Sequence, residues 1–118
     1  MNTLKEVIQS TEKNFTHIHA GIDKVAFTQK VHELLQSHGY KLIQGNDANG
    51  MYEKGNRVLR ILLGAFIQYF KFQIKTVENA EHLEVTVSRE TSGMSGGLVG
   101  MNQVKKEMQA IEETFKNL

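Results

Sequence analysis

Four glycines fall within residues 93–100, directly before a stretch with helical periodicity. A loop of this kind presents backbone N–H groups beside the positive end of a helix dipole, an arrangement that binds phosphate in many proteins. The groups that would hold an anion are Ser92, Ser95, the amides of Gly96 and Gly97, and Lys105. A P-loop would require Lys and then Ser or Thr after Gly100, but Met101 and Asn102 follow it. We therefore expect a flexible turn, with an anion site as the alternative.

His17 and His19 are a second candidate for a functional site, because imidazoles can bind metal ions. Alternate residues of a strand point to the same side, so both imidazoles could approach one metal ion. A third ligand would have to come from elsewhere, and spacing selects none of the other candidates: His32, His38, His82 and Glu33. We predict no metal site and no cofactor, and expect strand histidines at the surface or partly buried.

Sequence patterns typical of catalysis are absent. The chain has no cysteine, which removes thiolate nucleophiles and cysteine-bound metals. It contains neither a G-x-S-x-G elbow nor an H-E-x-x-H pattern. We therefore expect a protein that is not an enzyme.

Length and composition indicate one domain, residues 1–118, with an ordinary hydrophobic content of 40%. The formal net charge is +1, so no general attraction to nucleic acid or anionic lipid is expected. The longest uninterrupted apolar run, residues 61–67, is far shorter than the roughly 20 residues that cross a bilayer. No signal-peptide pattern is visible near residue 1, and we expect a cytoplasmic protein with no transmembrane segment.

Two segments have the apolar spacing of helices that pack on one side. In 23–38, where Asp23 is a candidate N-cap, the stripe consists of Phe27, Val31, Leu34 and Leu35. In 102–118 it consists of Val104, Met108, Ile111, Phe115 and Leu118, and charged residues including Lys105 and Glu112 occupy the remaining circumference. Thr3 and Glu6 are spaced as in a capping box, which predicts a further short helix over 3–13.

Elsewhere the period of the apolar residues is 2, which indicates strands. The expected strands are 15–20, 40–44, 51–54, 57–63, 67–77 and 82–89. In 67–77, Phe70, Phe72, Ile74 and Thr76 take one face. We predict an α+β fold: an antiparallel sheet of four to six strands with two helices packed on one face, in the order strand, helix, several strands, helix.

The apolar run 61–67 cannot alternate between core and solvent, so both sides of this strand must be covered. Burial in the protein's own core is the simplest cover, and a second copy, an apolar ligand or a membrane surface are alternatives. The residues singled out for such a surface are Leu62, Phe66, Tyr69 and Phe70. The polar face of the strand 67–77 carries Lys71 and Lys75 but one tyrosine only, and Glu84 of the next strand offsets part of the charge, so nucleic acid is not an expected partner.

These observations lead to an expected function. We expect a non-catalytic module that binds a protein partner, a second copy of itself or an apolar small ligand through its sheet. The alternative is an anion-dependent site, regulatory or catalytic, in the loop 92–100.

Overall fold

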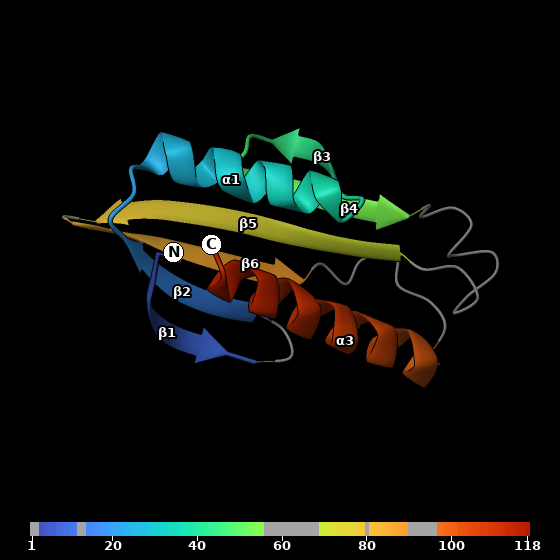
Figure 1. Ribbon diagram of the computed structural model, residues 1–118. Helices are drawn as coiled ribbons and strands as arrows, with labels where there is room; N and C mark the ends of the chain where they lie inside the picture. Colours follow the sequence, from blue (N-terminus) through green and yellow to red (C-terminus); the bar gives the residue numbers. More distant parts are fainter. Residues whose placement is uncertain (1–2, 12–13, 56–68, 80, 90–96) are drawn as a thin grey trace.

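The structure is a computed structural model of the chain (Figure 1) and describes residues 3–11, 14–55, 69–79, 81–89 and 97–118. For residue 69 and residues 97–104 the description covers the backbone only. The strands are β1 (Leu4–Ser10), β2 (Asn14–Ala20), β3 (Lys41–Gly45), β4 (Asn49–Gly55), β5 (Tyr69–Asn79) and β6 (His82–Arg89). The helices of these ranges are α1 (Lys24–Ser37) and α3 (Gly97–Lys116).

The six strands form one sheet in the order β1-β2-β6-β5-β4-β3, and every neighbouring pair is antiparallel. His17 and His19 are alternate residues of β2 and so share one face. His17 contacts Glu112 of α3, and His19 packs against Phe27 of α1, so both helices cover that face (Figure 1). The predicted α+β fold, its antiparallel sheet and its order of elements are confirmed.

The core lies between this sheet face and the two helices. Its largest fully buried side chains include Phe15, Phe27, Phe72, Phe115, Tyr40 and Tyr52. The alternation predicted for β5 is confirmed, because Phe70, Phe72, Ile74 and Thr76 are at most 4% exposed, whereas Gln73 and Lys75 between them are exposed. Burial of an apolar side chain of this size contributes about 2 kcal/mol, which is why the two amphipathic helices cover this face.

The first element differs from the prediction. The short helix expected over 3–13 is wrong, because Leu4–Ser10 forms β1 and pairs antiparallel with β2 from Leu4 opposite His19 to Ser10 opposite Phe15. A capping-box pattern in so short a segment is a weak local preference. The hydrogen-bond ladder with β2 and the β-branched Val7 and Ile8 favour the strand instead.

One further boundary differs as well. The last helix starts at Gly97, not at 102, so Gly97 and Gly100 of the expected turn belong to α3. The strand expected over 57–63 lies outside the described residues. Neither described helix combines the length and hydropathy required to cross a membrane.

Both edges of the sheet carry irregular strands. The register of β1 on β2 shifts between Leu4 and Glu6 and again between Val7 and Gln9, and that of β3 on β4 shifts between Leu42 and Gln44. Such bulges bend an edge away from the flat geometry that pairing with another strand requires. The register shifts therefore make β1 and β3 less suited to pairing with a further strand.

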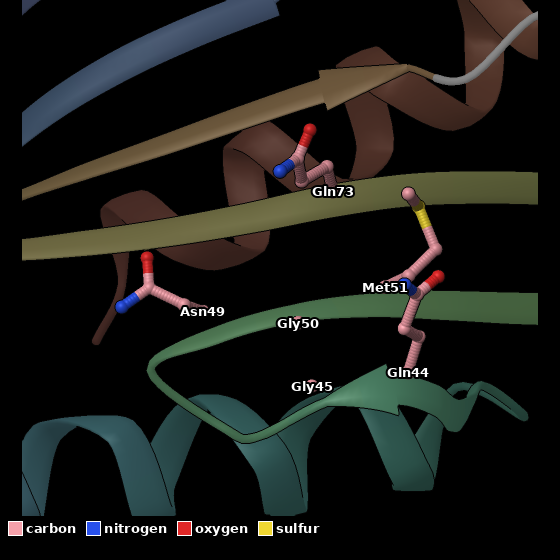
Figure 2. A pocket seen from close by; sticks show the side chains of 6 residues that line it. All are labelled: Gln44, Gly45, Asn49, Gly50, Met51 and Gln73. Atoms are coloured by element: carbon pink, nitrogen blue, oxygen red, sulfur yellow. The ribbon is translucent and has the colours of Figure 1, made fainter.

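The face of the sheet opposite the helices carries a shallow polar hollow over β3, β4 and β5. Three carboxamides, those of Gln44, Asn49 and Gln73, lie around Met51, and Gly45 and Gly50 complete the lining (Figure 2). The volume of the hollow is about 190 Å³. Because Phe72 and Ile74 face the core, Gln73 between them points away from the helices.

Gly45→Ala is expected to lower stability more than Gly21→Ala. Both glycines have positive φ, +80° and +76°, so either alanine should cost about 1 to 2 kcal/mol in backbone energy. Only at Gly45 would the new Cβ also overlap the backbone oxygen of Asn49; at Gly21 nothing lies within 4 Å. Urea unfolding should give a lower midpoint for Gly45→Ala, and equal midpoints would contradict the tight turn between β3 and β4.

Candidate functional site

A groove lies between the end of β1 and α3. Its lining residues are Ser10, Thr11, Lys105, Met108, Gln109 and Glu112, and its volume is about 260 Å³. Lys105, Met108 and Glu112 are spaced by three and four residues, so they share one face of α3. Ser10 pairs with Phe15, whose ring is buried against Phe115 of the same helix, and this register turns Ser10 toward α3.

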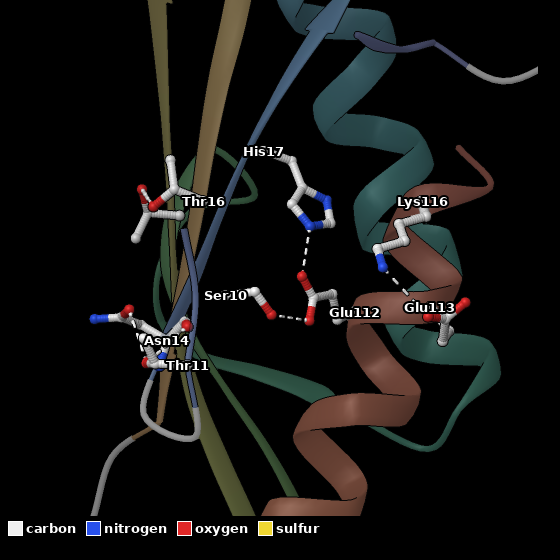
Figure 3. Close-up of polar contacts among 9 residues, drawn as sticks. Ser10, Thr11, Asn14, Thr16, His17, Glu112, Glu113 and Lys116 are labelled. Atoms are coloured by element: carbon white, nitrogen blue, oxygen red, sulfur yellow. Dashed lines mark hydrogen bonds and ion pairs between the residues drawn. The ribbon is translucent and has the colours of Figure 1, made fainter. Parts of the chain in front are cut away.

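A chain of hydrogen bonds leads from the groove into the core (Figure 3). The Ser10 hydroxyl donates to Oε1 of Glu112 over 2.6 Å. The other carboxylate oxygen, Oε2, lies 2.9 Å from Nε2 of His17. His17 is fully buried and Glu112 is 8% exposed. An ionised carboxylate only accepts hydrogen bonds, so Nε2 of His17 carries a proton.

A similar argument assigns the tautomer of His19. The Thr3 hydroxyl donates its one proton to the main-chain oxygen of Leu118 over 3.1 Å. Its oxygen must therefore accept from Nδ1 of His19, which is 2.7 Å away. The remaining nitrogens, Nδ1 of His17 and Nε2 of His19, are buried and have no hydrogen-bond partner among the residues that the structure describes.

Burial, and to a lesser extent electrostatic interaction with the neighbouring His17, lowers the pKa of His19 from 6.5 to about 4. His19 is consequently neutral at neutral pH. An uncharged imidazole with one bare lone pair is the least costly form of a histidine that no solvent reaches.

This arrangement is not that of a nucleophilic catalyst. In a serine hydrolase the imidazole lies between the hydroxyl and the carboxylate, so that it can take the proton of the hydroxyl. Here Glu112 lies between Ser10 and His17, and each carboxylate oxygen is engaged by one of them. No hydrogen bond joins His17 to the Ser10 hydroxyl, so His17 is not placed to take its proton directly.

Among the described residues, His17 and His19 are not joined by the third ligand that a metal site needs. Across the described ranges no three His, Asp or Glu side chains are grouped so that they could hold a metal ion. Glu112 is bonded to the protonated nitrogen of His17, which is not a ligating atom. His17 belongs to the hydrogen-bond chain through Glu112, and His19 is hydrogen-bonded to Thr3.

Two other buried polar contacts tie the helices to the rest of the core. The Tyr40 hydroxyl donates to Glu107 of α3 over 2.6 Å, and burial together with this bond raises the pKa of Tyr40. The Tyr52 hydroxyl lies 2.7 Å from Nδ1 of His32 in α1, and burial raises the pKa of Tyr52 to about 12. Both tyrosines stay neutral and hold the helices in place.

The residues selected from the sequence for an anion site are only partly within the described ranges. Ser92, Ser95 and Gly96 lie outside them, and Gly97 is the first residue of α3. Lys105 is exposed and lines the groove.

The residues selected for an apolar surface are also only partly within the described ranges. Leu62 and Phe66 lie outside the described ranges, and Tyr69 begins β5. Phe70 is 4% exposed and belongs to the core, so it faces the protein's own interior.

The sequence analysis did not single out Glu112 or Ser10. Glu112 was counted among the charged residues on the outer circumference of the last helix. It follows Met108 by four residues and precedes Phe115 by three, so it lies within the apolar stripe. A charge in such a stripe is the signal that could have identified it.

Comparisons with the models of known protein families and with curated proteins yield no match to this chain. Its function is therefore argued from the geometry of its residues.

Acidification is expected to destabilise the protein through His19. An unfolded histidine binds a proton near pH 6.5 and the folded one only near 4, so the unfolded state binds more protons in this window. The free energy of unfolding should therefore fall by up to about 3 kcal/mol as the pH drops from 6.5 to 4.

Urea unfolding at several pH values would measure this fall, and His19→Gln should show less of it. His38→Gln, which changes an exposed histidine, is the matched control and should behave as the unmodified protein. An unchanged pH dependence in His19→Gln would contradict the burial of a neutral His19.

Proposed function

We propose that this chain is a non-catalytic binding domain that takes a small polar ligand in the groove between β1 and α3. The observation that supports it is the carboxylate of Glu112 in the groove wall, 8% exposed and hydrogen-bonded on both oxygens. Removing a charge from water is costly, and an apolar residue at this point would continue the stripe of α3. A binding role accounts for the carboxylate, because it supplies a fixed acceptor at the side of a groove.

The proposal keeps the expected non-catalytic module and changes its ligand from apolar to polar. Phe70, from the surface first considered, faces the core. Lys105, from the anion alternative, lines the same groove as Glu112 and supports a ligand with a charged group. We propose the cytoplasm as its compartment, which the absence of cysteine supports.

The groove carboxylate should bind a primary ammonium group, with n-pentylamine as the probe. In ¹H–¹⁵N NMR titrations we expect saturable shifts of the Ser10, Thr11 and Gln109 amides, since these residues line the groove beside Glu112. Glu112→Gln removes the charge that attracts the ammonium and should weaken binding about tenfold.

Glu113→Gln is the matched control, because Glu113 is adjacent on α3, lies outside the groove lining and pairs only with the exposed Lys116 among the described contacts. It should leave the affinity unchanged. Shifts that are absent, or that gather around the hollow over β3, β4 and β5, would contradict the proposal.

A second candidate is self-association through the open face of the sheet, and the hollow around Met51 favours it. Centres of protein interfaces are poor in charge and rich in methionine, and their rims are polar. Beside the uncharged hollow lie Lys71 and Lys75 of β5 and Glu53 of β4. This mixture of signs is self-complementary, which a symmetric pair of identical copies requires.

Light scattering tests this second candidate. A dimer in the unmodified protein should become monomeric in Gln73→Lys, which places a charge in the lining of the hollow. Gln29→Lys, on the exposed side of α1, is the matched control and should remain dimeric. If the unmodified protein is a monomer, the proposed self-association is wrong.

A further inference from the structure

We propose that the ligand of the groove is an ω-amino carboxylate: an ammonium group held by Glu112, a carboxylate near Lys105 and an aliphatic chain along Met108. This inference rests on the proposed function and specifies the class of ligand. The inference is based on Lys105, Met108 and Glu112, which share one face of α3 and follow one another as a cation, an apolar side chain and an anion.

The spacing along α3 fixes the distance between the two charges. Lys105 and Glu112 are seven residues apart, which is two helical turns and about 10 Å along the axis. Met108 lies between them on the same face and is 2% exposed, so it forms an apolar part of the wall. A ligand that meets both charges must therefore carry its own charges several bonds apart, with apolar atoms between them.

The anionic end of the groove has the chemistry to receive an ammonium group. A carboxylate offers about four lone-pair positions, and Glu112 uses one for Ser10 and one for His17, so acceptor capacity remains. The Ser10 hydroxyl donates to Glu112, which leaves its own oxygen lone pairs as further acceptors. An ammonium group has three N–H donors to distribute among these oxygens.

The cationic end suits a carboxylate. Lys105 is exposed and lines the groove, so its ammonium group supplies a positive charge at this end. The side-chain amide of Gln109 offers further N–H donors in the same lining. The volume of about 260 Å³ corresponds to roughly nine water molecules, which is room for a compact chain.

This geometry separates two isomers of identical composition. In 6-aminohexanoate the ammonium and carboxylate are at opposite ends of a five-carbon chain, whereas in norleucine both are attached to one carbon. Norleucine can place only one of its charges against Lys105 or Glu112. We expect 6-aminohexanoate to bind about tenfold more tightly than norleucine, because it makes one additional charged contact.

The test is a set of NMR titrations with 6-aminohexanoate, norleucine, n-pentylamine and hexanoate, followed at the amides of the groove residues. The expected order has 6-aminohexanoate first, about tenfold tighter than n-pentylamine, which is the same molecule without its carboxylate. In Lys105→Gln this advantage should disappear, while n-pentylamine binds as before. Lys106→Gln, next along α3 and outside the groove lining, is the matched control and should keep the advantage.

The outcomes separate the inference from the function on which it rests. If n-pentylamine binds at the groove and 6-aminohexanoate binds no more tightly, the ligand class is wrong and the proposed groove function stands. An advantage of 6-aminohexanoate that survives Lys105→Gln overturns the assignment of Lys105 in the same way. If none of the four probes shifts the groove amides, both the inference and the proposed function fail.

Discussion

A buried carboxylate within the apolar face of a helix requires hydrogen-bond donors. Two different strands supply them to Glu112. Ser10 of β1 and His17 of β2 each donate to one of its oxygens. Because unpaired buried charges are strongly destabilising, these two bonds constrain where α3 can lie on the sheet, together with the packing of its apolar side chains. The groove beside β1 follows from that placement, since Ser10 and Glu112 form part of its walls.

The same region joins the two ends of the described chain. The Thr3 hydroxyl accepts a hydrogen bond from Nδ1 of His19 and donates one to the backbone oxygen of Leu118. The backbone N–H of Thr3 also donates to Leu118, so β1 and the end of α3 meet over β2 (Figure 1). Neutral His19 is compatible with its burial, whereas a charged one is not. The polar contacts that position the groove therefore depend on the protonation of histidines that no solvent reaches.

Much of this fold follows from periodicity in the sequence. Alternation over β5 and β6 and the apolar stripes of both helices are local patterns, and the structure agrees with them. The helix expected over 3–13 is wrong because the deciding interaction, pairing with β2, is not local. Glu112 and Ser10 are 102 residues apart, so no spacing rule could join them, although the charge within the stripe of α3 was visible.

The central claim is that the Glu112 carboxylate lies between Ser10 and a buried His17. Long-range ¹H–¹⁵N correlation of the histidine side chains at neutral pH tests it most directly. The account predicts that His17 carries its proton on Nε2 and that His19 carries its proton on Nδ1, each as a single tautomer. A His17 protonated on Nδ1, or one that exchanges freely between tautomers, would contradict it.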